Sequence, residues 1–526
     1  MEAGRHEQSR SIPIPLIPLP SSLVEKVALD RVNKLLFVDR RHAGDPQLLT
    51  WQDRNRSNGN VLHIKPCDVD EVARYRAGGM RAGTEEDEDL VVRNRALDIL
   101  SRAAQYRASD VHFMLRGAYT EVQVVIKGDL RVLERFSQTE GEGIVRSIYQ
   151  GIATIRDGSY KPLEFQNAQI SADDLPSNTG LSSTRVVRGP AYPQAQDGAF
   201  MTIRLQYQPG QGNIQQKDLP PLELPRQPEG ELALGVMGYT DNQVERIKTL
   251  MDAPNGLIIY TGPTGSGKTT TIFECLQHAA RTKPHRRQVT IEDPVEYPME
   301  WAVQMTVTGT KNDKENGAEF IKRVQVALRM APDTILIGEI RGPEVAVAAL
   351  ESALTGHQVL STLHVTDPFL FVDRLEIMDR KRLARQVFCD HKIVRGVIAQ
   401  RLVPKLCKEC SIPLDKAPGA LPERIVQSLK TWGSLEKVRI KGPGCKECGG
   451  DGTLGRFAVA EVLVMDAKVM ADFIEHGSDV ARVNYRARDD ADPSMLETAI
   501  NYVLAGKLDP RSVEDSVDLI EPKGKV

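Results

Sequence analysis

The residues best placed to do chemistry form a glycine-rich loop at 262–269, with the sequence Gly-Pro-Thr-Gly-Ser-Gly-Lys-Thr. This loop matches the pattern G-x-x-x-x-G-K-[ST] at every position and stands between an apolar run and a helical pattern. Its glycines let successive backbone N–H groups point at one anion, and the dipole of the following helix adds positive charge. The loop therefore predicts a nucleotide-phosphate site, with Lys268 at the outer phosphates and the Thr269 hydroxyl on Mg²⁺. The residues of the site are Gly262, Pro263, Thr264, Gly265, Ser266, Gly267, Lys268 and Thr269.

Two acidic residues stand where a carboxylate could hold metal or orient water beside a terminal phosphate, as hydrolysis requires. Glu339 follows the apolar run 335–338, where a charge is costly unless it emerges at a functional edge. Glu296 lies in the acidic segment 290–297, just past another apolar run. Both are predicted catalytic residues, and the alternative for each is an ordinary surface acid.

A pair of histidines, His357 and His364, brackets the apolar run 359–363. Both could lie near the ends of a strand, where a histidine could hydrogen-bond the terminal phosphate. The alternative is that they are structural histidines, which the spacing also suits.

Four cysteines form two C-x-x-C pairs, Cys407–Cys410 and Cys445–Cys448. Thiolate pairs of this kind hold Zn²⁺ in a closed tetrahedral site, although the separation between the pairs exceeds the common range. A zinc ion with four protein ligands has no open position, so its predicted role is structural. The alternatives are reduced thiols or disulfides. The isolated residues Cys67, Cys275 and Cys389 are predicted to be packing residues.

The elements that must position these residues alternate between short apolar runs and longer helical patterns. This rhythm predicts a mainly parallel sheet, with the ligand at the carboxyl ends of its strands. The predicted strands are 257–260, 288–292, 334–338 and 358–362, and the predicted helices are 268–281, 317–329 and 343–354. Upstream, an α+β region is predicted over 91–206, with helices at 91–107 and 140–156 and a hairpin at 120–136 that turns at Gly128-Asp129.

Composition bounds the class of protein. The chain has 526 residues, a net charge of −3 and 5% aromatic residues, which argues against a nucleic-acid coat or a base-stacking surface. No apolar stretch is long enough to predict a membrane span, the early prolines make a secretory signal unexpected, and sparse cysteine suits a reducing compartment. Three stretches without hydrophobic periodicity are predicted linkers or loops, at 76–90, 207–230 and 411–422.

Taken together, the motifs resemble those of the secretion (traffic) ATPases, which power type II secretion and type IV pilus assembly. The matching stretches, in order, are GPTGSGKTTT, IEDPVEY, APDTILIGEIRGPE, LTGHQVLSTLH and GVIAQRLVPKLCKEC. The likeness is nearly continuous over 237–465, and a weaker one, opened by Ala-Ser-Asp-Val-His at 108–112, covers 100–205. Residues 1–90 resemble nothing named, which suggests a system-specific docking domain.

The resemblance implies a hexameric ring with ATP bound between subunits. Lys268, Thr269 and Thr270 would hold phosphates and Mg²⁺, and Glu339 would polarise the attacking water with help from Glu296. His357 and His364 would line the pocket. It also implies an inner-membrane platform protein and a cytoplasmic adaptor as partners, and a cytoplasmic location at that membrane. No nucleic acid is expected.

Arginines of the 91–206 region are expected to reach the γ-phosphate, where neutralising transition-state charge can be worth about 10³–10⁵ in rate. Arg188 and Arg204 are the residues that align best, and Arg185 competes with them. The family's usual motifs are altered at Ala331, at Gly342 and after Arg188, which suggests a divergent type IVb or conjugative thin-pilus branch.

The predicted fold is α/β, with a RecA-like phosphate-loop core that follows α+β domains and carries a zinc module. The predicted domains are 1–90 (docking domain and linker), 91–206 (α+β domain), 207–236 (linker), 237–401 (ATPase core), 402–465 (zinc module) and 466–526 (helical region). The predicted function is a motor that hydrolyses ATP to drive assembly of pilins or pseudopilins. The alternatives are a pilus-retraction motor, a nucleic-acid translocase on the same core, and a non-enzymatic zinc adaptor.

Overall fold

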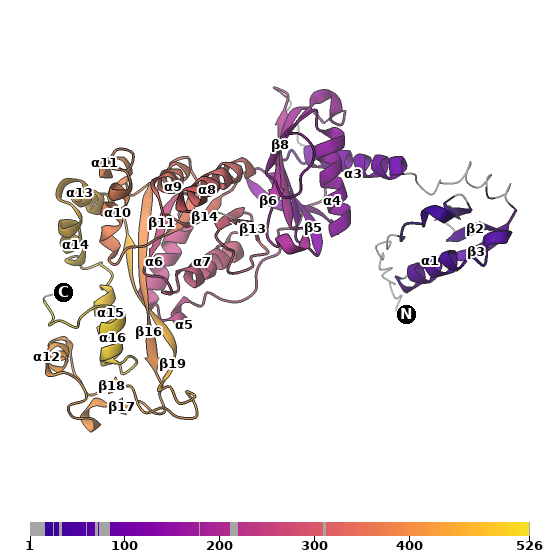
Figure 1. Ribbon diagram of the computed structural model, residues 1–526. Coiled ribbons are helices and arrows are strands. Elements are labelled where there is room, and N and C mark those ends of the chain that lie inside the picture. Colours follow the sequence, from indigo (N-terminus) through magenta and orange to yellow (C-terminus); the bar gives the residue numbers. More distant parts are fainter. Residues whose placement is uncertain are drawn as a thin grey trace, which may run out of the picture. The chain divides into compact units, whose positions relative to one another are not determined.

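The computed structural model divides the chain into two compact units, Met1–Ala96 and Leu97–Val526 (Figure 1). The structure describes residues 16–524 apart from 25, 31–33, 59, 69–71, 73–84, 178, 211–218 and 309–311. Parts of the expected linkers, at 76–84 and 211–218, therefore lie outside the described residues. No helix in the described ranges is both long enough and apolar enough to span a membrane.

The first unit holds a small three-stranded sheet in the order β1-β2-β3. Its strands are β1 (Val27–Asp30), β2 (Leu35–Asp39) and β3 (His63–Cys67), and helix α1 (Pro46–Ser57) follows β2. Leu36 and Val38 of the central strand pack with Leu48 and Trp51 of α1 in one buried cluster. These contacts give the region a small core of its own.

Helix α3 (Glu85–Gln105) crosses the boundary between the units. It begins six residues before the helix predicted at 91–107 and takes up the end of the stretch predicted as a linker. The reason is local, because the run Glu-Glu-Asp-Glu-Asp-Leu continues directly into a helical pattern and glutamate and leucine have good helix propensity.

A seven-stranded antiparallel sheet opens the second unit, in the order β6-β5-β4-β10-β9-β8-β7. Helix α4 (Gln138–Ser147) packs on it and continues as a π-helical segment over Ile148–Ile152, so the helical stretch ends four residues before the predicted end at 156. The predicted hairpin is present, but its turn lies one residue earlier, at Lys127 and Gly128, which both have positive φ. The strands are β4 (Asp110–Leu115), β5 (Tyr119–Ile126), β6 (Asp129–Ser137), β7 (Ile155–Arg156), β8 (Gln166–Ser171), β9 (Leu181–Pro190) and β10 (Ala199–Tyr207).

The predicted parallel sheet follows, in the order β13-β12-β14-β15-β11-β16-β19 (Figure 1). All neighbouring strands are parallel except β16 and β19, which are antiparallel. The strands are β11 (Gly256–Thr261), β12 (Gln288–Glu292), β13 (Ala302–Thr306), β14 (Thr334–Glu339), β15 (Gln358–Leu363), β16 (Val394–Leu406) and β19 (Thr453–Val464). The helices around the first five are α5 (Leu234–Met237), α6 (Asp241–Asp252), α7 (Lys268–Thr282), α8 (Asp313–Ala327), α9 (Pro343–Leu354), α10 (Phe371–Met378) and α11 (Arg385–Phe388).

The central strand β11 shows why the strands of this sheet appear in the sequence as short, continuous apolar runs. Leu257 and Ile259 join the hydrophobic cluster on one face of the sheet, and Ile258 and Tyr260 join the cluster on the other. Both faces are covered, so the four consecutive residues 257–260 are all apolar rather than every second one. The prediction of a mainly parallel α/β sheet is confirmed.

The four-cysteine region is an extension of this sheet. Strands β16 and β19 form a long antiparallel hairpin in the parallel sheet, so the domain edge expected after residue 401 falls inside β16. The expected loop at 411–422 contains the short strand β17 (Ile412–Pro413), which pairs with β18 (Arg439–Ile440). The helices of this region and of the C-terminal part are α12 (Glu423–Trp432), α13 (Ala467–His476), α14 (Ser478–Arg486), α15 (Met495–Leu504) and α16 (Pro510–Ser516).

Candidate active site

The glycine-rich loop joins the carboxyl end of β11 to the first turn of α7, as predicted. Gly262, Gly265 and Gly267 all have positive φ, which side-chain-bearing residues rarely adopt. At Gly262 a Cβ atom would lie only 2.5 Å from the carbonyl oxygen of Gln400 on β16. The Gln400 side chain also donates a 2.6 Å hydrogen bond to the carbonyl of Ser266. Strand β16 therefore fixes the curl of the loop.

Lys268 lies folded onto the loop that precedes it. Its Nζ atom donates to the carbonyl oxygens of Gly262 and Pro263 at 3.0 and 2.9 Å. Burial lowers the pKa of Lys268, and the nearby carboxylate of Glu339 opposes that shift. The Ser266 hydroxyl is buried without a partner in the part of the chain that the structure describes. A buried donor and a lysine held over curled backbone fit a phosphate group.

A cavity of 290 Å³ opens beside the loop. Thr264, Gly265, Lys268 and Thr269 line it from the loop side, and Glu339 lines it from the end of β14. The other glycines and Pro263 shape the loop without lining the cavity. Thr270 does not line the cavity either, and its hydroxyl is hydrogen-bonded to the Tyr297 hydroxyl at 3.0 Å.

Glu339 reaches the cavity through an irregularity at the end of β14. The pairing with β15 shifts between Ile337 and Glu339, which makes Gly338 an extra residue in the strand. The Thr362 hydroxyl donates to the Gly338 carbonyl at 2.9 Å. Such a bulge changes the direction of the side chain that follows it. Here it turns Glu339 toward the loop, where Arg341 forms an ion pair with the carboxylate.

The two histidines lie at opposite ends of β15. His364 lines the cavity, with Nε2 3.8 Å from the Glu339 carboxylate, and burial together with the Lys268 charge lowers its pKa. His357 instead precedes the amino end of β15, where Nδ1 lies 3.0 Å from the carbonyl of Ser352. The prediction that His357 lines the pocket is therefore wrong for this chain, because a strand separates it from the loop.

The segment that carries His364 is anchored from two sides. Arg401 of β16 donates to the carbonyl of Thr366 at 2.9 Å. Asp367 accepts from the backbone N–H of Phe369 and pairs with Arg482 of α14 at 3.2 Å. Each of these bonds fixes backbone within a few residues of the histidine, so its place beside Glu339 is set by the fold.

More acidic groups meet at the cavity than the sequence predicted. Glu296 is there and exposed, as expected of an assisting carboxylate. Glu292 and Asp293 also line the cavity. Glu292 is buried, accepts a 3.0 Å hydrogen bond from Gln304, and has a pKa raised by burial. Sequence analysis missed Glu292, although its place at the last residue of an apolar strand was the same signal that singled out Glu339.

Mg²⁺ would find oxygen ligands here, as its chemistry demands. The Thr269 hydroxyl lines the cavity together with the carboxylates of Glu292, Asp293 and Glu339. These groups fit a hard divalent cation that is shared with a phosphate.

Arg188 is not available to a nucleotide. Its side chain is fully buried and donates to the carbonyls of Lys161 at 2.6 Å and Pro162 at 2.9 Å. Its guanidinium also lies 4.3 Å from the centre of the Tyr160 ring. The prediction that Arg188 reaches the γ-phosphate is therefore wrong, because the guanidinium holds the 160–166 loop against the sheet.

The competing candidate Arg185 is exposed and lines a cavity, unlike Arg188. Arg185 and Arg204 are direct cross-strand neighbours on β9 and β10, and both are exposed. They line a second cavity, of 440 Å³, together with Arg156 and Arg329. A cavity with four arginines fits an anion.

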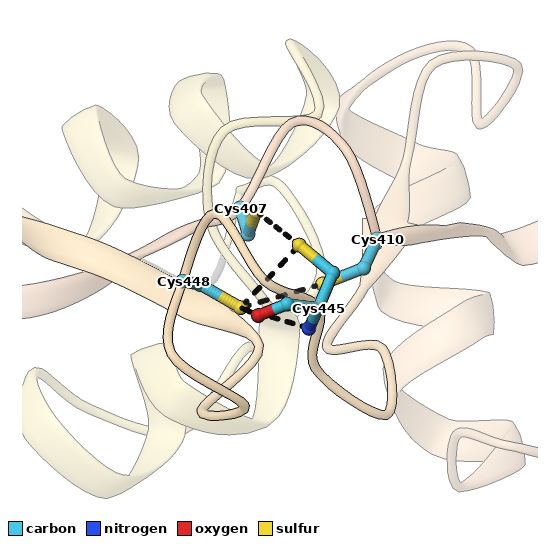
Figure 2. Close-up of side chains that lie close together, drawn as sticks. All are labelled: Cys407, Cys410, Cys445 and Cys448. Atoms are coloured by element: carbon cyan, nitrogen blue, oxygen red, sulfur yellow. Dashed lines mark hydrogen bonds between the residues drawn. The ribbon is translucent and has the colours of Figure 1, made fainter.

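The four cysteines converge at the tip of the β16–β19 hairpin (Figure 2). Three of the distances between sulfur atoms are 3.7, 3.7 and 3.8 Å, for Cys407–Cys445, Cys410–Cys448 and Cys445–Cys448. Disulfide sulfurs lie about 2.05 Å apart, and tetrahedral zinc with bonds of about 2.3 Å places its sulfurs about 3.8 Å apart. The cluster therefore fits Zn²⁺ and excludes disulfides within this arrangement.

Backbone groups around the cluster support negative sulfur. The N–H groups of Cys445 and Gly452 donate to the Cys448 sulfur at 3.2 and 3.1 Å, which lowers the pKa of that thiol. A Cβ atom on Gly442 would lie 1.7 Å from the Cys410 carbonyl oxygen, so only glycine allows the two knuckles to approach. The lone cysteines Cys67, Cys275 and Cys389 are buried, which suits packing residues.

The contrast between Arg188 and Arg185 gives a prediction about stability. Arg188→Ala should destabilise the antiparallel sheet by roughly 3 kcal/mol, because it leaves the 160–166 loop without its donors. Arg185→Ala should cost no more than about 0.5 kcal/mol, because its side chain is exposed. Hydrogen exchange of β8 and β9 measures the difference. Equal protection in the two variants would contradict the structural role of Arg188.

Zinc content tests the cysteine cluster. The protein as purified should carry about one zinc ion per chain, and Cys445→Ser should lower this to near zero and lower the unfolding temperature. Cys389→Ala removes a thiol outside the cluster and should leave zinc unchanged. Metal analysis by mass spectrometry measures both. A Cys445→Ser protein with full zinc would rule out this ligand set.

Residues 223–515, more than half of the chain, match the family described as "Type II/IV secretion system protein". The chain is 33% identical over 270 residues to type IV pilus assembly ATPase PilB of Thermus thermophilus, which is 51% of this chain and 29% of that protein. It is also 33% identical over 277 residues to type II secretion system protein E of Pectobacterium carotovorum, or 52% of this chain and 51% of that one.

The chain spans about half or less of the length of these relatives. Among solved structures, the pilus retraction motor PilT with bound ADP is similar, with a TM-score of 0.39 and 21% sequence identity. That likeness covers 82% of this chain and 97% of the other. On the match to the family over more than half of its length, the chain belongs to the Type II/IV secretion system protein family.

Proposed function

We propose that this chain is the ATPase motor that drives assembly of pilins or pseudopilins in a type IV pilus or type II secretion system. One observation carries the proposal: the phosphate-type loop and the strand-end carboxylate of Glu339 line one 290 Å³ cavity. Loop amides and Lys268 can hold the phosphates of ATP while the carboxylate faces the place where water would attack. The family match and the two named relatives support the same activity.

Within this proposal, each residue has a task. Lys268 moves from the carbonyls of Gly262 and Pro263 to the outer phosphates, and Thr269 with nearby carboxylates holds Mg²⁺, which neutralises phosphate charge when bound. Glu339 is held by Arg341 in this structure. To orient water, the carboxylate must share or leave that pair. His364 stands 3.8 Å from the carboxylate and can accept or donate a hydrogen bond there.

The arginine cavity supports a site completed by a neighbouring copy. Arg329 lies before the amino end of β14 and donates to Asn167 at 2.5 Å, whereas Glu339 lies at the carboxyl end. A six-residue strand at ~3.3 Å per residue puts these ends roughly 17 Å apart. We therefore propose that Arg185 and Arg204 serve the nucleotide of an adjacent subunit, in a homo-hexameric ring.

The family match supports partners of a secretion or pilus machine. An inner-membrane platform protein and a cytoplasmic adaptor would recruit the motor to the cytoplasmic face of the inner membrane. The four-cysteine hairpin favours the assembly branch over the retraction branch, since the resemblance associates that insertion with assembly motors. Loss of surface pili or of secretion on deletion of the gene is the expected phenotype; pili that extend but fail to retract would reverse the direction.

Two variants test hydrolysis. Lys268→Ala should lower the ATPase rate by about 10²-fold or more with loss of nucleotide binding, because the phosphates lose their cation. Glu339→Gln should lower the rate by about 10²–10⁴-fold while ATP still binds, because only the water-orienting group is lost. The matched control is Glu344→Gln, which removes an acid paired with Arg382 on the surface. Phosphate release and binding of a fluorescent nucleotide measure the two effects, and full activity in either variant would end the proposal.

A mixing experiment tests the shared site. Lys268→Ala chains and Arg204→Ala chains should each have a strongly reduced but measurable ATPase rate alone. Mixed rings should regain activity. Where the two kinds of chain meet, the Arg204→Ala chain supplies Lys268 and the adjacent Lys268→Ala chain supplies Arg204, so one complete site forms. If both groups came from one chain, mixing would restore nothing. Native mass spectrometry confirms that mixed rings form, so inactive mixed rings would contradict a composite site.

A further inference from the structure

One row of residues crosses the antiparallel sheet on a single face. In the strand register, Asp110 of β4 lies opposite Arg204 of β10, which lies opposite Arg185 of β9, which lies opposite Gln169 of β8. Directly opposed residues point to the same side of a sheet. Two guanidinium groups therefore stand side by side with one carboxylate at the end of the row, and like charges in this arrangement repel.

Asp110 differs from every other member of the row because it is buried. Its side chain is 4% exposed, whereas that of Arg204 is 47% exposed. The Arg204 Nε atom donates to Asp110 Oδ1 at 3.0 Å. Within the described part of the chain, this is the hydrogen bond that the Arg204 side chain makes. Nε is engaged in this bond, and Arg204 also lines the 440 Å³ cavity.

The groups around Asp110 are buried, apart from Arg204. His112, two residues along β4, has a hydrogen bond of 2.9 Å to Thr202 and a pKa lowered by burial and by the charges of Arg287 and Arg204. Arg287 is a second cation near Asp110; burial lowers its pKa to about 9, and Asp110 opposes that shift. Asp110 is thus a buried carboxyl group close to two arginines, of which Arg204 is exposed and Arg287 is buried.

We propose that Asp110 is a positioning residue for the reaction: it holds Arg204 through Nε, so that the outer face of the guanidinium presents both Nη groups to the terminal phosphate of nucleotide. This inference rests on the proposed function, in which Arg204 contacts the nucleotide of a neighbouring copy. A planar guanidinium held on one edge offers a bidentate fork on the other, and such a fork matches phosphate geometry.

The test compares ATPase kinetics of Asp110→Asn, Arg204→Ala and the double variant. Asparagine keeps an acceptor of the same shape but removes the charge that fixes Nε. We expect kcat to fall tenfold or more, with KM for ATP changed by less than about twofold, because Lys268 and its loop still bind the phosphates. In the double variant no further loss is expected, because Asp110 acts only through Arg204.

The matched control is Asp129→Asn, which removes an aspartate from a half-exposed pair with Arg131 on the same sheet. It should leave both kinetic constants unchanged. Thermal unfolding of all variants separates folding from positioning.

Each outcome decides between alternatives. A wild-type kcat in Asp110→Asn would overturn the positioning role. If Asp110→Asn lowers kcat by the same factor in the Arg204→Ala background as in the wild type, Asp110 has a purely structural role, and the proposal is also overturned. Wild-type activity in Arg204→Ala would instead overturn the arginine part of the proposed function. If Asp110→Asn fails to fold, Arg204→Lys tests the same contact at an exposed side chain. Lysine keeps the charge without an Nε–H to be held, so a wild-type kcat there would also refute the proposal.

Discussion

Parallel pairing of β11, β15 and β14 is the constraint on which the candidate site depends. Parallel strands end at the same edge of a sheet, so strand pairing alone brings the loop after β11 close to the carboxylate at the end of β14. Close backbone contact then refines the edge. Gly262 lies against the Gln400 carbonyl of β16, and Gly338 forms the bulge that turns Glu339 toward the cavity. The hairpin strand β16 is therefore part of the phosphate site as well as the support of the cysteine cluster.

The sequence predicted those features that local patterns encode. Apolar runs located the strands, and the spacing of glycines with Lys268 located the loop. The four cysteines fit the predicted metal site because their two knuckles end adjacent strands of one hairpin. Residue spacing along one strand was a weaker guide. His357 and His364 are only seven residues apart, but β15 lies between them and brings only His364 to the cavity.

Strand register explains the arginine error. Arg185 and Arg188 differ by an odd number of positions, so they lie on opposite faces of β9, and only the tertiary structure decides which face is covered. The 160–166 loop covers the face of Arg188, where carbonyl groups satisfy the guanidinium. No local sequence pattern predicts that the 160–166 loop covers this face. Alignment of motifs alone could not choose between the two residues, since the choice depends on contacts from a distant part of the chain.

The two cavities differ in the sign of the charged side chains that line them, and under the proposed function this difference could control how neighbouring copies make contact. Around the 290 Å³ cavity, the four carboxylates of Glu292, Asp293, Glu296 and Glu339 outnumber the two cations Lys268 and Arg341. The acidic excess suits a phosphate that arrives with a metal ion. The arginine cavity gathers four cations, with Asp157 as the acid in its lining. Bringing the first cavity of one copy against the second cavity of another would join a metal-bound phosphate to a cationic surface. Hydrolysis and phosphate loss would then remove the anion that holds the two surfaces together, and the like-charged row of Arg185 and Arg204 would favour separation. Nucleotide state could in this way control contact between neighbouring copies through electrostatics alone.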